Sequence, residues 1–70
     1  MNELVFDVVQ EADGGYCAEC LTESIATEGN TWDELKMNVR EAVKGYFFDQ
    51  PQMQTVSIRL HLVRDEVLAA

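Results

Sequence analysis

The sequence predicts an α+β fold in which a small antiparallel sheet carries one long helix on one face. Asp13–Tyr16 joins two segments of alternating apolar and polar residues, as the turn of a β-hairpin does. Thr31–Leu35 then opens a segment with the apolar spacing of a helix. The expected order of elements is β-β-(β)-α-β, and the 70 residues are expected to form a single domain, residues 1–70.

The hairpin is expected to pair a strand at Leu4–Gln10 with a return strand at Tyr16–Leu21. Side chains of a strand alternate between the two faces of a sheet, so the apolar positions of each strand should share one face. These positions are Leu4, Phe6 and Val8 in the first strand and Tyr16, Ala18 and Cys20 in the second. Gly14 and Gly15 supply the backbone freedom that a tight turn needs before Tyr16.

A helix is expected to begin after Thr31. Thr31 and Glu34 form a capping box, in which the hydroxyl accepts a hydrogen bond from a free backbone N–H and the carboxylate reaches back to another. The helix should end near Phe48, shortly before Pro51. Its expected buried stripe consists of Trp32, Leu35, Val39, Ala42, Val43 and Tyr46.

Extended segments are expected on both sides of this helix. Ser24–Glu28 precedes it as a short third strand or an extended segment, and Gln54–Val63 follows it as the final strand. The final strand alternates regularly, so one set of side chains should face inward and the other outward. The inward set is Val56, Ile58, Leu60 and Leu62, and the outward set is Ser57, Arg59, His61 and Val63.

The charge of the chain is strongly negative and unevenly distributed. It has 13 acidic and 5 basic residues, a net charge of -8 at pH 7, and every Lys and Arg lies after Thr31. This balance disfavours direct binding of nucleic acid, which requires a basic patch, and suits a basic protein partner. Solubility alone is the alternative explanation. The candidate partner-docking residues are Glu3, Asp7, Glu11, Glu19 and Glu23.

Self-association is expected because a chain of this length buries a modest core. Four apolar residues fall on the otherwise polar face of the predicted sheet, where they would form an exposed patch. These candidates for self-association are Val5, Val9, Leu21 and Val63. We therefore expect a homo-dimer or a higher homo-oligomer.

Cys17 and Cys20 form a CxxC pattern that we interpret as ordinary packing residues. Residues three apart on a strand point to opposite faces, and no second pair of ligands completes a zinc site. No nucleophile or carboxylate is fixed near His61 by the sequence, so we expect no general base there. A divalent metal on the acidic residues, with Asp7 as a nuclease carboxylate, is an alternative. The preferred prediction is a non-enzymatic protein without catalytic, metal-binding or cofactor-binding residues.

Two further features concern the surface and the compartment. Lys36, Arg40 and Lys44 form a basic stripe on the helix, which is either an ordinary exposed face or a small docking surface. The N-terminus lacks a basic segment followed by an apolar one, and no apolar stretch approaches the length of a membrane span. We expect a cytoplasmic protein that binds no membrane, with reduced cysteines.

The hairpin and the helix start together resemble the HicB-like antitoxin family. Members of that family have an N-terminal strand, a D-G-G-Y hairpin and a G-D-T-x-x-E-A helix start. Here Gly14, Gly15 and Tyr16 match the hairpin, and Thr31 and Glu34 match the helix cap. The resemblance covers Leu4–Phe48. It implies a truncated ribonuclease H-like unit of order β-β-β-α-β that lacks nuclease activity.

The resemblance also implies a function. Typical members bind and sterically block HicA, a small basic RNA-cleaving toxin, and many carry a C-terminal DNA-binding module. This sequence ends at Ala70, so we expect no such module here. The alternative function is a stand-alone homo-oligomeric protein of another role, such as a small-molecule binder or an accessory subunit.

Overall fold

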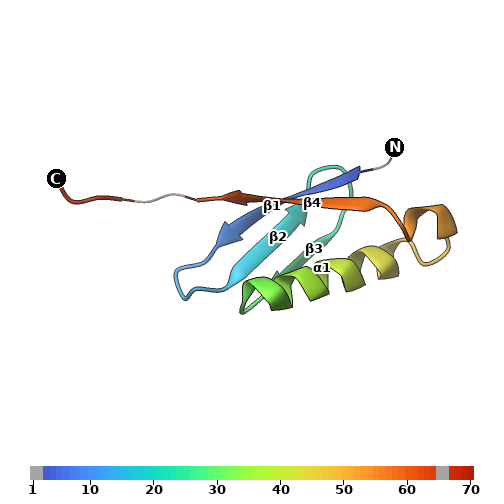
Figure 1. The fold of residues 1–70 in the computed structure, drawn as a ribbon, viewed down its shortest axis with the longest axis horizontal. Helices are drawn as coiled ribbons and strands as arrows, with labels where there is room; N and C mark the ends of the chain where they lie inside the picture. The colour runs from blue at the N-terminus through green and yellow to red at the C-terminus, as the bar shows by residue number, and fades with distance from the viewer. Residues whose placement is uncertain (1–2, 65–66) are drawn as a thin grey trace.

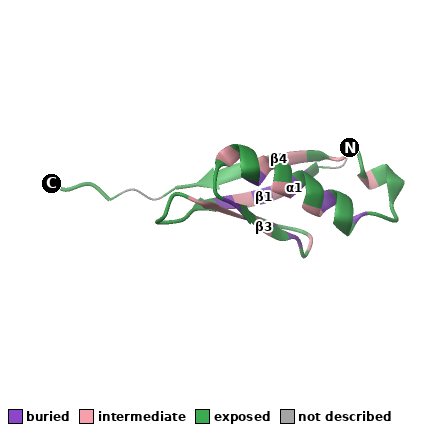
Figure 2. Ribbon diagram, turned by 90° about the horizontal axis from the view of Figure 1, so that it is seen from below, coloured by how far each residue is buried: buried purple, intermediate pink, exposed green. Residues whose placement is uncertain are grey.

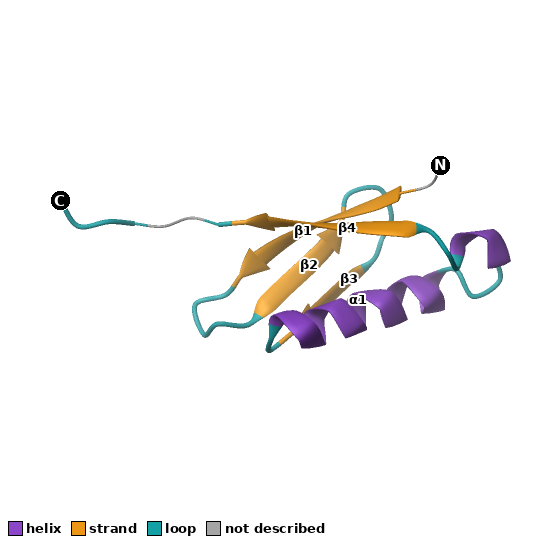
Figure 3. Cartoon of the chain, viewed as in Figure 1, coloured by secondary structure: helices purple, strands orange, loops and turns teal. Residues whose placement is uncertain are grey.

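The computed structural model describes residues 3–64 and 67–70. Within these residues, a four-stranded sheet carries a helix on one face (Figures 1 and 2). The elements in chain order are β1 (Glu3–Gln10), β2 (Tyr16–Cys20), β3 (Ala26–Gly29), α1 (Trp32–Tyr46), the short 3-10 helix η1 (Pro51–Met53) and β4 (Ser57–Val63) (Figure 3). No helix in this part of the chain is long and apolar enough to cross a bilayer. The α+β class and the order of elements are confirmed, including the third strand.

The sheet is mixed, which differs from the expected antiparallel arrangement in its last strand. The spatial order is β3-β2-β1-β4; β2 pairs antiparallel with both β1 and β3, and β4 pairs parallel with β1. The chain leaves β3 at one edge and crosses through α1 to the other edge. Because the helix carries the chain back along the sheet, β4 runs in the same direction as β3 and β1.

The β1–β2 hairpin has the predicted turn. Gly14 has φ 93°, a left-handed conformation that glycine adopts without steric cost. The Asp13 carboxylate accepts a hydrogen bond from the Gly15 N–H at 3.0 Å, and the Gly14 N–H donates to the Glu11 carbonyl at 2.9 Å. This local bonding fixes the turn and therefore the register that places Val8 opposite Ala18.

The core lies between the sheet and α1. The predicted apolar face is confirmed: Leu4, Phe6, Val8, Ala18 and Cys20 are all buried. From the helix, Leu35, Val39 and Val43 complete the core, and Ile25 and Phe47 close its ends. Tyr16, at the rim of this core, meets Trp32 edge-on with the ring centroids 5.4 Å apart.

The helix start follows the predicted cap with one difference. Thr31 is the N-cap, and its hydroxyl accepts a hydrogen bond from the Glu34 N–H at 3.1 Å. The Glu34 carboxylate accepts from the N–H of Asn30 at 3.1 Å, one residue before the N-cap position to which a capping box usually reaches. Both hydrogen bonds hold the chain as it passes from β3 into α1.

The end of the helix corrects the predicted buried stripe. Tyr46 is exposed, and Phe47, which follows the last helical residue, is buried in its place. The buried positions Leu35, Val39 and Val43 continue at a spacing of four to Phe47, whereas Tyr46 lies one position off this row. Gln54 donates from its side chain to the Phe47 carbonyl at 2.6 Å, so the following loop folds back onto this end.

The inner face of β4 is less covered than predicted. Val56, Ile58 and Leu60 are half-buried, and Leu62 is 40% exposed, which contradicts its assignment to a covered face. The helix packs chiefly against β3 and β2, and in Figure 1 it runs along the β3 side of the sheet. The edge strand on the opposite side therefore receives only part of its cover from α1.

Candidate partner-binding face

The sheet face that points away from α1, called the outer face below, carries most of the predicted functional residues. Strand register places Glu19, Asp7 and His61 side by side across β2, β1 and β4. A second row sets Glu28 beside Cys17, and Cys17 beside Val9. Charged and apolar side chains therefore alternate along this face.

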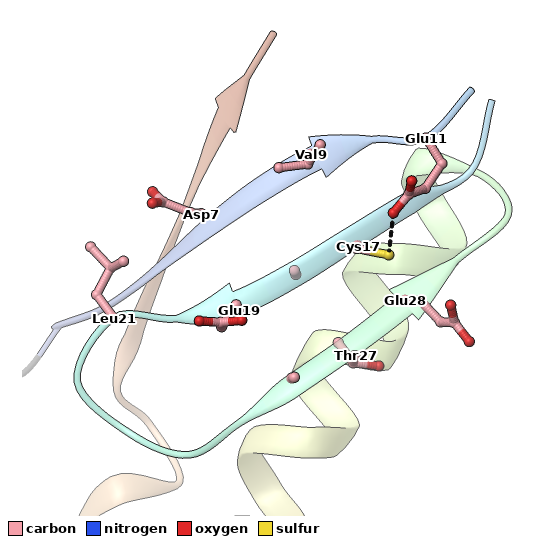
Figure 4. A pocket seen from close by; sticks show the side chains of 10 residues that line it. Asp7, Val9, Glu11, Cys17, Glu19, Leu21, Thr27 and Glu28 are labelled. Atoms are coloured by element: carbon pink, nitrogen blue, oxygen red, sulfur yellow. Dashed lines mark hydrogen bonds between the residues drawn. The ribbon is translucent and has the colours of Figure 1, made fainter. Parts of the chain in front are cut away.

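A shallow depression of about 660 Å³ lies on the outer face over β1, β2 and β3 (Figure 4). Four carboxylates, from Asp7, Glu11, Glu19 and Glu28, line it. Apolar contact surface comes from Val9 and Leu21, which is 60% exposed. In the close-up the helix lies behind the strands, so the depression opens on the free side of the sheet.

The acidic charge of this face is partly neutralised at β4. Arg59 donates to the Glu3 carboxylate through both Nε and Nη2, at 3.1 and 3.2 Å, and this contact raises the pKa of Arg59. His61 Nδ1 lies 3.3 Å from an oxygen of Asp7. In the part of the chain that the structure describes, no basic side chain pairs with Glu19 or Glu28. The carboxylates of Glu19 on β2 and Glu28 on β3 therefore keep their negative charge without a basic partner beside them in this part of the chain.

Cys17 lies within the depression as a protonated thiol. Its Sγ donates a hydrogen bond to Oε1 of Glu11 over 2.9 Å. This hydrogen bond, with help from partial desolvation and the nearby carboxylates of Glu11, Glu28 and Asp13, raises the pKa of Cys17 from 9.0 to about 11. A nucleophilic cysteine needs the opposite shift, because the thiolate is the reactive form.

The structure gathers most of the predicted docking residues but not all of them. Glu3, Asp7, Glu11 and Glu19 belong to the outer face, whereas Glu23 lies in the loop between β2 and β3. Glu28, which was absent from the predicted set, lies opposite Cys17 in the register. Glu28 could have been included from the sequence if the predicted third strand had been paired with the second, because that pairing brings Glu28 onto the same face as Cys17.

The predicted self-association residues share this face with the docking residues. Val9 stands beside Val63 in the β1–β4 register, and the Leu21 N–H donates to the Val5 carbonyl at 3.0 Å. Val9, Leu21 and Val63 are exposed, and Val5 is half-buried. The two residue sets therefore form a single mixed surface, on which apolar side chains are surrounded by carboxylates.

The remaining chemical candidates are dispersed. Cys17 is half-buried on the outer face and Cys20 is buried in the core, as expected for residues three apart on a strand, and both are free thiols. Among residues 3–64 and 67–70, no group of three His, Cys, Asp or Glu side chains is arranged to hold a metal ion. On α1, Lys36 of the basic stripe forms an ion pair with Asp33 at 3.1 Å.

The fold and this face define a class of protein. The class is a small α+β protein whose open sheet face is acidic and partly apolar.

The chain is 44% identical over 46 residues to a UPF0150 protein from Thermotoga maritima, and the matched stretch spans 66% of this chain and 66% of the relative. No family model matches the chain, and no solved structure is significantly similar to it.

Proposed function

We propose that this protein is a HicB-like antitoxin that binds a small basic RNA-cleaving toxin and sterically blocks it. The proposal rests on the outer face, where the carboxylates of Asp7, Glu11, Glu19 and Glu28 surround exposed apolar side chains. The similarity to a UPF0150 protein supports the proposal, because UPF0150 is the HicB-like family.

The proposed mechanism is coverage of the toxin rather than chemistry. A basic ribonuclease holds RNA through cationic side chains, and an acidic face of complementary charge competes for that surface. Glu19 and Glu28 have no basic partner among the described residues, so their charge is available to a ligand. Leu21 and Val9 are exposed and would supply apolar contacts from which water is excluded on binding. Such contacts would slow the dissociation of the complex.

Binding fits this site better than catalysis does. Cys17, which lies within the depression, has its pKa raised to about 11, chiefly by the hydrogen bond to Glu11. His61 stands outside the depression, against Asp7. We therefore propose a non-enzymatic protein that acts in the cytoplasm, where a toxin of this kind meets its RNA.

The proposal is tested with any small basic protein that is encoded beside this chain in its host. The two proteins are mixed, and the cleavage of RNA by the basic protein is followed with and without a stoichiometric amount of this chain. We expect a stable mixed complex and suppressed cleavage. A basic protein that cleaves RNA at an unchanged rate and elutes separately would refute the antitoxin function.

A further inference from the structure

The two edges of the sheet differ in how they are protected. β3 has four residues, lies against α1, and has its Glu28 carbonyl bound by the side chain of Asn38 at 2.7 Å. β4 has seven residues, and no other strand in the described part of the chain lies beyond it. Ser57–Val63 contains neither proline nor lysine, the residues that usually keep an edge strand from pairing. The backbone of β4 is therefore open to another strand.

The apolar side of β4 is also incompletely covered. Two hollows, of about 140 and 210 Å³, separate α1 from β4. Ile58 lines both of them, and Leu60 lines the smaller one. Leu62, further along the same face, is 40% exposed. A strand placed beside β4 would cover this apolar row as well as its backbone.

We propose that two copies of this chain associate through β4, antiparallel to each other about a two-fold axis at Leu60. In this register Leu60 faces Leu60 of the second copy, and Ile58 faces Leu62. Ser57 faces Val63, so every residue of β4 is paired. The apolar inner row of one copy then continues into that of the other, and an eight-stranded sheet forms from the two four-stranded ones.

The outer side of β4 favours this register. Arg59 would face His61 of the second copy. Within each copy, Arg59 keeps its contact with Glu3 of β1, and His61 keeps its contact with Asp7 of β1. Moving the axis by one residue, to Arg59, would set two guanidinium groups directly opposite each other. Like charges at such positions destabilise a strand pair. The charges therefore favour an axis at Leu60 over one at Arg59.

This interface is separate from the acidic depression, which β1, β2 and β3 form. Both depressions would lie on the same side of the eight-stranded sheet, free to bind a partner. The dimer therefore differs from the arrangement predicted from sequence, in which Val5, Val9, Leu21 and Val63 associate, and it does not depend on the existence of a toxin.

The first test compares two substitutions at exposed leucines by sedimentation or light scattering of the purified chain. The unmodified protein should have about twice the 7.9 kDa mass of one chain. Leu62→Asp should raise the dimer dissociation constant by at least about tenfold, because a carboxylate would be desolvated in each copy. Leu21→Asp should leave the dimer intact. A single-chain mass for the unmodified protein, or dissociation by Leu21→Asp with Leu62→Asp still dimeric, would overturn the proposal.

A covalent trap tests the register without disturbing the charge. Leu60→Cys, in a chain that also carries Cys17→Ser, should form a disulfide-linked dimer under mild oxidation, since residues on the axis lie within bonding distance of each other. Leu21→Cys in the same background is the control and should stay monomeric on a denaturing gel. Equal cross-linking of the two variants would contradict the proposed pairing.

Discussion

The thiol of Cys17 donates a hydrogen bond to the carboxylate of Glu11 across the β1–β2 hairpin, with 2.9 Å between Sγ and Oε1. Because the bond is made to the protonated thiol, it raises the pKa of Cys17 to about 11. Glu11→Gln should lower this pKa toward the ordinary value of 9.0, since the acceptor loses its charge. The pKa is measured from the ultraviolet absorbance of the thiolate. Glu19→Gln is the control, and an unmodified Cys17 that titrates at 9.0 would contradict the geometry.

The same thiol makes stability depend on pH in the alkaline range. Its folded-state pKa lies above the unfolded value of 9.0, so the protonated thiol favours the folded protein. This contribution is fully present below pH 9, falls as the pH rises and is lost above about 11. Urea unfolding across this range should show a smaller loss of stability in Cys17→Ser than in the unmodified protein. Identical pH dependence in the two proteins would count against the hydrogen bond.

Gly29 and Gly45 should respond in opposite directions to alanine. A Cβ on Gly29 would lie 2.5 Å from the Leu35 backbone nitrogen, whereas one on Gly45 would meet nothing within 4 Å. Gly29→Ala should therefore destabilise the protein by about 1 to 3 kcal/mol through overpacking. Gly45→Ala should stabilise it by about 0.5 to 1 kcal/mol, because alanine is the better helix residue. Denaturant unfolding of the two variants decides this, and a neutral Gly29→Ala would mean that β3 and α1 are less closely packed.

Two substitutions of the N-cap residue Thr31 separate the contribution of its hydroxyl from that of its methyl group. Thr31→Ala removes the acceptor for the Glu34 N–H and should cost about 1 kcal/mol. Thr31→Ser keeps the hydroxyl and should retain most of the stability. Thermal unfolding followed by circular dichroism compares the two variants. Equal losses would show that the methyl group of Thr31, rather than its hydroxyl, is what matters.

Phe47 and Tyr46 distinguish the observed helix end from the one predicted. Phe47→Ala should cost about 3 to 5 kcal/mol, because the ring is almost completely buried. Tyr46→Ala should cost about 1 kcal/mol, which is the value of its edge-on contact with Phe47. Urea unfolding gives both values. A larger loss of stability for Tyr46→Ala than for Phe47→Ala would instead support the buried stripe predicted from the sequence, which ends at Tyr46.

Local signals made much of this fold predictable. The turn at Asp13–Gly15 and the cap at Thr31 are each held by hydrogen bonds between near neighbours in sequence, so their residue types carry the structure. The alternation of Leu4, Phe6 and Val8 likewise gave the core face of β1, because a strand has a fixed period of two.

The features that the sequence did not predict depend on pairing at long range. The direction of β4 follows from the crossing of α1 to the far edge of the sheet, which no local pattern encodes. The exposure of Leu62 depends on where the helix lies over that sheet. Glu28 joins the acidic depression only because β3 pairs with β2 in one particular register. The composition predicted an acidic surface, but the pairing of the strands determines which acidic residues line the depression.

The central claim is that the outer face binds a basic protein through Glu19 and Glu28, and a matched pair of double variants tests it most directly. Glu19→Lys with Glu28→Lys reverses two charges in the depression. Glu41→Lys with Asp49→Lys changes the net charge equally at exposed positions on and after α1. Affinity for the proposed basic RNA-cleaving partner is measured by calorimetry at fixed salt. The account predicts a loss of at least about tenfold for the first variant and little change for the second. Equal affinities for the two variants would contradict it.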